Sequence, residues 1–166
     1  MEVPMQIHKK GSEISTMIFN QNLNSLLVGK ENGCLLQFER DLFGDLKKLK
    51  DYGDIELGEI SASDWLGDFA VVGGDTWMIS LINMKKREVI QKKIKTAIEL
   101  IYSLQFCKVS LNQIYLVVGG IGRKDYSDSK TDWFDVSDFF NLGPGKGESI
   151  KITKKKLIQK LKAREE

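Results

Sequence analysis

Apolar and polar residues alternate in short runs along the chain, and three of these runs end in the same pair of residues. Each run is apolar and closes on Val-Gly. Successive pairs lie roughly 45 residues apart, which is typical of propeller blades built from four short strands. The pairs are Val28-Gly29, Val72-Gly73 and Val118-Gly119. The pattern therefore predicts three repeats of an antiparallel sheet.

The first repeat predicts a four-stranded meander. Alternation and β-branched residues indicate strands, and a Lys-rich segment fits an outer strand because charge discourages pairing with other chains. Asn32-Gly33 predicts a two-residue turn of the primed type, with positive φ at both positions. The expected strands are Ile14–Phe19, Leu26–Gly29, Cys34–Glu39 and Leu46–Tyr52.

The second and third repeats follow the first, with one departure. A polar segment, RKDYSDSKTD (Arg123–Asp132), is inserted between the second and third strands of the third repeat. Each first strand ends in an aromatic residue, Phe19, Trp65 or Phe106, which we expect to pack between adjacent sheets. The expected strands are Ile60–Trp65, Phe69–Gly74, Trp77–Asn83 and Arg87–Ile94 in the second repeat, and Ile101–Phe106, Ile114–Gly120, Trp133–Phe140 and Ser149–Thr153 in the third.

Two segments resemble the turn and third strand of a WD40 repeat. NGCLLQFE (Asn32–Glu39) has Asn-Gly where that family usually has Asp-Gly, and Phe38-Glu39 where Trp-Asp would stand. GGDTWMISLIN (Gly73–Asn83) is similar and ends in Ile-Asn. The resemblance covers about residues 13–153. It implies an all-β fold of about three four-stranded antiparallel blades of a β-propeller, and a role as a protein-interaction scaffold.

These repeats suggest the domain organisation. Residues 1–12 are expected to form a lead-in or an edge strand, and the three blades are expected at about residues 13–54, 55–96 and 97–153. Residues 154–166 place apolar residues on one side and lysines elsewhere, which predicts a short basic C-terminal helix.

Three blades leave the ring incomplete, because closed propellers typically contain about four to eight. An open flank exposes the apolar face that a neighbouring blade should cover. Two copies of the chain could form a six-bladed ring, or another chain could supply the missing blades. A smaller curved sheet, in which the third repeat is not a blade, is the remaining alternative.

Charge is distributed unevenly along the 166 residues. The formal net charge is +2, and residues 151–166 carry seven Lys or Arg against two Glu, so the rest of the chain is slightly acidic. That distribution argues against nucleic acid as a partner of the folded body. We expect no signal peptide or membrane span, and Cys34 and Cys107 form no CxxC motif. A cytoplasmic protein is expected, with the nucleus as the alternative.

Candidate catalytic and metal-binding groups are sparse. His8 is the sole histidine, and no base or nucleophile is patterned around it as a triad requires. LGPGKGES (Leu142–Ser149) lacks the hydroxyl residue that follows Lys in a phosphate-binding loop, so a loop between strands fits better. Five aspartates suggest calcium, but their spacing does not match an EF-hand and a solvated loop is favoured. They are Asp125, Asp128, Asp132, Asp135 and Asp138. We expect no enzymatic activity, metal, cofactor or small-molecule substrate.

The inserted segment is a candidate for partner binding. It carries Arg123, Lys124 and Tyr126, and both Arg and Tyr are favoured at interface hot spots. Loops between second and third strands lie on one rim of a propeller, where a rigid scaffold can present them to a partner. Trp77, in the second repeat, is a further candidate. A tolerated insertion without a binding role is the alternative.

The C-terminal segment is the second candidate region. Leu157 and Leu161 lie on the apolar side of its expected helix. The helix either packs on the blades or docks into a groove of a partner through the same residues. The third reading is an adaptor that binds nucleic acid or an acidic membrane surface through the basic residues of this tail.

Overall fold

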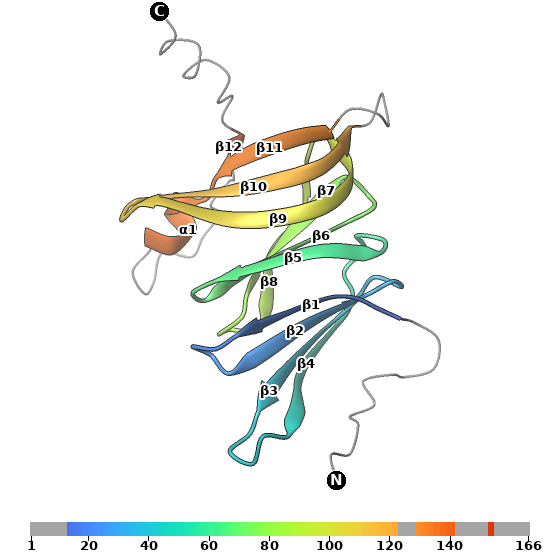
Figure 1. Cartoon of the computed structure of the whole chain (residues 1–166), viewed down its shortest axis with the longest axis vertical. Helices are drawn as coiled ribbons and strands as arrows, with labels where there is room; N and C mark the ends of the chain where they lie inside the picture. The colour runs from blue at the N-terminus through green and yellow to red at the C-terminus, as the bar shows by residue number, and fades with distance from the viewer. Residues whose placement is uncertain (1–12, 123–128, 142–152, 155–166) are drawn as a thin grey trace, which may run out of the picture.

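The computed structural model describes residues 13–122, 129–141 and 153–154, which form three four-stranded antiparallel sheets and one short helix (Figure 1). The first sheet, here the first blade, contains β1 (Ile14–Asn20), β2 (Ser25–Lys30), β3 (Cys34–Arg40) and β4 (Leu46–Asp54). The second blade contains β5 (Ile60–Leu66), β6 (Phe69–Gly74), β7 (Met78–Asn83) and β8 (Glu88–Lys95). The third contains β9 (Ile98–Ser110), β10 (Gln113–Gly122), β11 (Ser129–Asp135) and β12 (Thr153–Lys154), and α1 (Ser137–Asn141) follows β11.

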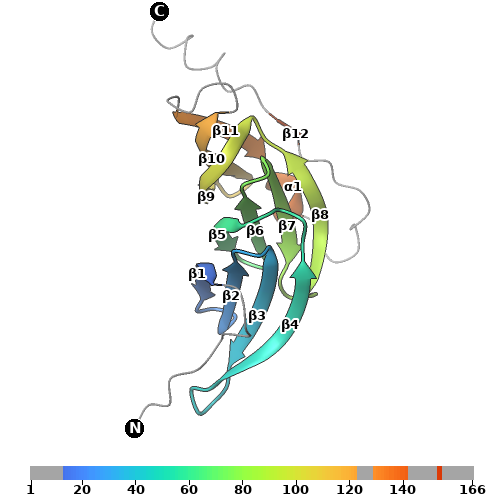
Figure 2. The ribbon, with the colours of Figure 1, turned by 90° about the vertical axis from the view of Figure 1, so that its right-hand side faces the viewer.

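Each blade is a meander, because its strands pair in the order in which they occur along the chain. The blades stand face to face in a row. Figure 2 shows β1, β5 and β9 along one side of this row, with β4 and β8 along the other. The chain is therefore all-β, with sheets arranged as in consecutive propeller blades.

Two apolar layers hold the row together. The first interface, between the first and second blades, buries a cluster that includes Leu27, Leu35 and Ile60. The second interface, between the second and third blades, buries a larger cluster that includes Ile101 and Leu116. Side chains on a strand alternate between the two faces of its sheet, and the second blade is covered on both sides. Residues from both of its faces are therefore buried in the core.

The outermost strands of the first two blades are rich in lysine. β4 carries Lys47, Lys48 and Lys50, and all three are exposed. Lysines also occupy β8, where Lys93 pairs with Glu56. The predicted charged outer strands are confirmed in these two blades.

The turn after β2 differs from its prediction. Three residues, 31–33, connect β2 and β3, and the N–H of Gly33 donates to the Lys30 carbonyl at 3.0 Å. Gly33 has a φ of 80°, whereas Asn32 is not among the residues with positive φ. The side chain of Asn32 instead accepts the N–H of Cys34. The prediction of a two-residue primed turn is therefore wrong, and the loop is of the three-residue type in which only the last residue is left-handed.

The segment Trp133–Phe140 also departs from the prediction of a single strand. β11 ends at Asp135, whose carboxylate accepts hydrogen bonds from the N–H and the Oγ of Ser137 at 3.1 and 2.6 Å. α1 then turns Phe140 back against Phe69 and Phe106, with ring centroids 5.0 and 5.5 Å apart. A helix forms because these rings fill the end of the second interface.

Three smaller expectations are corrected as well. β11 begins at Ser129, which pairs with Ile121, so residues 129–132 belong to a strand rather than to the inserted loop. Lys154 lies in β12 and not in a helix. Trp77 precedes β7 and adopts a positive φ of 56°, so it belongs to a turn.

Candidate protein-interaction surfaces

The two blade–blade interfaces repeat one contact, which shows how the Val-Gly pairs act. A methyl group built on Gly29 would lie 2.7 Å from Cγ2 of Ile60, and one built on Gly73 would lie 3.1 Å from Cγ2 of Ile101. Both distances are shorter than ordinary van der Waals contact. Each glycine therefore makes room for an isoleucine near the start of the first strand of the next blade.

A hydrogen bond accompanies this contact in both interfaces. The Oγ of Ser15 donates to the carbonyl of Ile60 at 2.6 Å, and the Oγ of Ser61 donates to the carbonyl of Ile101 at 2.5 Å. In β1 and β5 the pairing register shifts at this point, as in a β-bulge. Bulges re-aim side chains, so the shift turns each serine toward the neighbouring blade.

Among the residues that the structure describes, the third member of this series has no neighbour in another blade. A methyl group built on Gly119 would meet only its own cross-strand partner, with Cβ of Ser103 3.5 Å away. Tyr102 stands where Ser15 and Ser61 stand in the other blades, and its side chain is exposed. Gly119 thus keeps the open space of the other two glycines, with no isoleucine against it.

Gly119 lies on the face of the third blade that points away from the second blade. This face is called the third-blade free face. It is built from residues that pair across β9, β10 and β11 and point away from the second interface. The rings of Tyr115 and Trp133 meet edge to face on it, with centroids 6.4 Å apart. Its members are Ser103, Gln105, Tyr115, Val117, Gly119, Thr131 and Trp133. None of them is fully buried.

The opposite end of the row has an apolar surface, the first-blade free face. It points away from the first interface, and cross-strand pairs connect its residues through β1, β2 and β3. Met17 and Phe19 are 58% and 44% exposed, Leu26 and Leu36 are half-buried, and Val28 and Phe38 are buried. All six side chains are apolar. The expectation that Phe19 packs between sheets is wrong, because no blade lies beyond β1 in the described residues.

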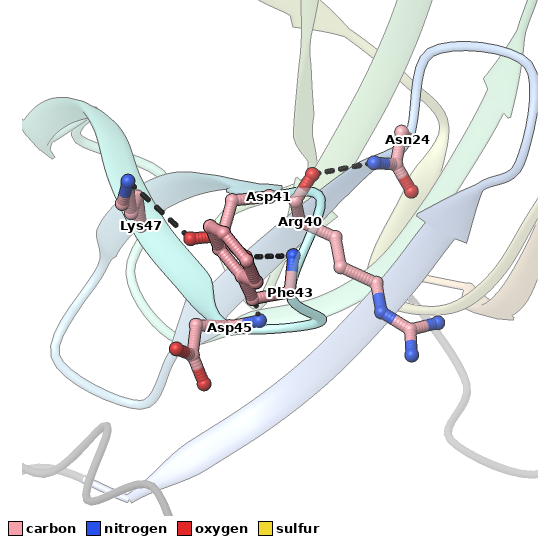
Figure 3. A network of polar contacts seen from close by, with 6 residues as sticks. All are labelled: Asn24, Arg40, Asp41, Phe43, Asp45 and Lys47. Carbon is pink, nitrogen blue, oxygen red and sulfur yellow. Dashed lines mark hydrogen bonds and ion pairs between the residues drawn. The ribbon is translucent and has the colours of Figure 1, made fainter.

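A third surface is the turn between β3 and β4, where Leu42 and Phe43 are both almost fully exposed. Asp41 holds the turn in shape (Figure 3), since its carboxylate accepts the N–H groups of Phe43 and Asp45 at 2.9 Å each. The Nζ of Lys47 lies 3.3 Å from the same carboxylate. Partial desolvation raises the pKa of Asp41, but these hydrogen bonds and the lysine outweigh it and hold the pKa below its ordinary value.

One buried polar chain crosses the first interface. The hydroxyl of Tyr52 donates to Oε1 of Gln37 at 2.9 Å, and Nε2 of Gln37 donates to the carbonyl of Met84 at 3.4 Å. Burial raises the pKa of Tyr52 to about 12, and the charge of Arg87 opposes this only in part. These two hydrogen bonds give the buried side-chain amide of Gln37 its partners, and they connect the first blade to the second.

The residues singled out in the sequence are only partly described. Trp77 is half-buried, its carbonyl accepts the N–H of Thr96, and the Nζ of Lys95 lies 5.3 Å from the centre of its ring. Its role in partner binding stays a prediction. The other candidates and His8, with the segment Leu142–Ser149, lie outside the described residues. Those other candidates are Arg123, Lys124, Tyr126, Leu157 and Leu161.

Two of the aspartates that suggested calcium have other partners, and Asp138 is exposed in the first turn of α1. Asp132 accepts the N–H of Ala97 at 2.6 Å, and Asp135 caps the turn into α1. Asp125 and Asp128 lie outside the described residues. Within the described ranges, no group of three His, Cys, Asp or Glu residues is placed to hold a metal ion. Cys34 and Cys107 are free and half-buried.

Comparisons with known proteins add little. No family model matches the chain, and no curated protein sequence does. Among solved structures, the chain is similar to the WD40 domain of Neurospora crassa Pan2, at 12% identity and a TM-score of 0.31, over 81% of this chain and 67% of that one. A TM-score this low establishes no detailed correspondence, so the description of the blades rests on the sheets and their two interfaces. Among the described residues, no helix is long and apolar enough to cross a membrane.

The sequence predicted an open flank, but it did not identify the residues of either free face or the exposed pair Leu42 and Phe43. A signal for the first-blade free face was present, because Leu26, Leu27 and Val28 are consecutive apolar residues. An apolar run without alternation is typical of a strand that is buried on both faces. The first blade therefore carries the residues of an internal blade, although no other described segment covers one of its faces.

Proposed function

We propose that the chain is a non-enzymatic protein-interaction scaffold, an incomplete propeller that another β-sheet completes. The sheet comes from a second copy of the chain or from a different protein. One observation carries the proposal: the first-blade free face is apolar across three strands and still exposes Met17 and Phe19. Contiguous exposed apolar surface on a protein marks a binding site.

The kind of partner follows from the geometry of the interfaces. In both existing interfaces the apolar face of one sheet packs against another sheet, with a first-strand isoleucine over a glycine. The free faces carry the same arrangement of strands, so a sheet fits them better than a helix or a loop does. We expect this scaffold to act in the cytoplasm, with the turn residue Trp77 as a candidate contact for a partner.

Site-specific crosslinking tests the proposal. A photoreactive phenylalanine analogue replaces Phe19 on the first-blade free face, and the same analogue replaces Lys92 on the outer strand β8 as the matched control. We expect the analogue at position 19, but not at position 92, to crosslink to residues in a β-sheet, identified by mass spectrometry of the joined peptides. Equal crosslinking at both positions, or attachment only to unstructured segments, would contradict it.

A further inference from the structure

The two free faces carry the complementary features of the two existing interfaces. In each existing interface the face with the glycine, Gly29 or Gly73, belongs to the earlier blade, and the isoleucine belongs to the later blade. The third-blade free face carries the unused glycine, Gly119. The isoleucine that corresponds to Ile60 and Ile101 is Ile14, at the start of β1.

We propose that the third-blade free face binds the first-blade free face of a second copy of this chain, with Ile14 of the copy over Gly119. The inference rests on the proposed function and specifies its partner. Two copies related by a two-fold axis form this interface twice, so both ends of each row are covered and a six-bladed ring closes. Six blades lie within the usual range of closed propellers, about four to eight.

Equivalent positions support this pairing over a pairing of like faces. Met17 and Phe19 in β1 correspond to Leu104 and Phe106 in β9, which are 7% and 8% exposed because the second blade covers them. The surface that covers them includes Val71 and Gly73. Val117 and Gly119 occupy the corresponding places in β10, so the third blade offers Met17 and Phe19 the same backbone shape that their equivalents already pack against.

The proposed interface differs from the existing ones in one hydrogen bond. Ser15 and Ser61 donate to the isoleucine carbonyl of the next blade, whereas Tyr102 occupies that position in the third blade. Tyr102 is 59% exposed, and its ring is placed to cover the edge of the contact instead. Aromatic residues contribute apolar area to interfaces, with the hydroxyl left at the solvent side.

Gly119→Val is the decisive variant. A Cβ at this position meets nothing closer than 3.5 Å among the described residues, and valine suits a strand, so the fold is expected to be retained. In the dimer the added methyl groups take the space of Ile14. The second variant, Met17→Lys with Phe19→Lys, changes the other half of the interface at exposed positions. Lys92→Val on β8 is the matched control.

Sedimentation equilibrium and light scattering of the full chain give the mass. We expect wild type and Lys92→Val at twice the 18.8 kDa of one chain, and each interface variant alone at the mass of one chain with an unchanged circular dichroism spectrum. The two interface variants mixed together retain one intact interface. They should form a one-to-one pair at least about tenfold weaker than the wild-type dimer, because closure by a second interface is lost.

Three results would overturn the proposal. A wild-type chain that stays at 18.8 kDa at every concentration excludes the second copy as the occupant. A dimer that survives Gly119→Val shows that like faces, or other surfaces, pair. A chain that dimerises only after residues 1–12 are removed shows that this segment occupies the first-blade free face. The crosslinking at position 19 remains a separate test, so a monomeric chain that crosslinks to another protein's sheet refutes the copy pairing alone.

Discussion

The first and third blades present equivalent faces to different surroundings. Phe106 and Leu104 of the third blade are 8% and 7% exposed, whereas Phe19 and Met17, at the same positions of the first blade, are 44% and 58% exposed. The residue types are alike, and only the neighbour differs. The repeat therefore sets the chemistry of a face, while its contribution to stability depends on the presence of an adjoining sheet.

Alanine substitutions at the two equivalent aromatic positions, Phe19 and Phe106, should give the largest difference in stability between the two blades. Phe106→Ala is expected to lower the free energy of unfolding by about 3–5 kcal/mol, because it leaves a cavity in the second interface. Phe19→Ala should cost less than about 1 kcal/mol, because its side chain is partly in water already. Urea denaturation at a protein concentration where the chain is monomeric measures both. Equal losses would mean that the first-blade free face is covered within the single chain.

The glycines provide the next largest contrast. Gly29→Val should lower the free energy of unfolding by about 1–3 kcal/mol, because its methyl groups displace Ile60 from a packed interface. Gly119→Val introduces the same side chain at the equivalent place and should change it by less than about 0.5 kcal/mol. Thermal and urea unfolding of the two variants gives the comparison. A large loss for Gly119→Val would show that a contact on the third-blade free face exists within one chain.

High pH should loosen the covered first interface. The folded pKa of Tyr52 is raised from 10.0 to about 12, so its stabilising effect is complete below pH 10 and is lost as the pH rises through about 12. We expect the free energy of unfolding to fall over this window in the wild type and to fall less in Tyr52→Phe. Tyr102→Phe, at an exposed tyrosine of the third blade, is the substitution control, and all curves are measured at a protein concentration where the chain is monomeric. If the Tyr52→Phe variant lost stability as steeply as the wild type, ionisation of the Tyr52 hydroxyl would not be the cause of the loss.

Substitutions on the first-blade free face should have the smallest effect on stability. They should nevertheless change the amount of exposed apolar surface measurably. Met17→Ser with Phe19→Ser should leave the free energy of unfolding within about 0.5 kcal/mol of the wild type. It should also reduce the fluorescence of a dye that binds exposed apolar surface, because the largest exposed side chains of that face are gone. The same dye on Leu42→Ser with Phe43→Ser shows how much signal comes from the β3–β4 turn. If the variant with Met17→Ser and Phe19→Ser gave unchanged fluorescence, the dye would bind apolar surface outside the first-blade free face.

Much of the fold was predictable because the apolar residues repeat. The strands around Val28, Val72 and Val118 were located within a few residues, since alternation and turn residues agree there. The prediction failed where tertiary packing decided the local structure. Phe139 and Phe140 look like the end of a strand, and they form a helix because their rings pack against Phe69.

The candidate surfaces were harder to predict, for a physical reason. A sequence shows that Phe19 and Phe106 are equivalent, but it does not show which of them has a neighbour, because that depends on where the row of blades ends. Exposure of Leu42 and Phe43 is equally invisible, since the turn is fixed by the carboxylate of Asp41 and not by an apolar pattern. Trp77, which stood out by residue type, is half-buried in a turn.

The lysines along β4 and β8 affect whether further strands can be added to the edges of these sheets. An edge strand with unpaired backbone groups can recruit strands from other molecules, and charge on that edge opposes such recruitment. With Lys47, Lys48 and Lys50 on one outer edge and Lys92 and Lys93 on the next, sheets cannot easily lengthen sideways by adding strands. This charge disfavours edge-to-edge pairing of the first two sheets with strands of other molecules, which is the route by which β-rich chains form fibres.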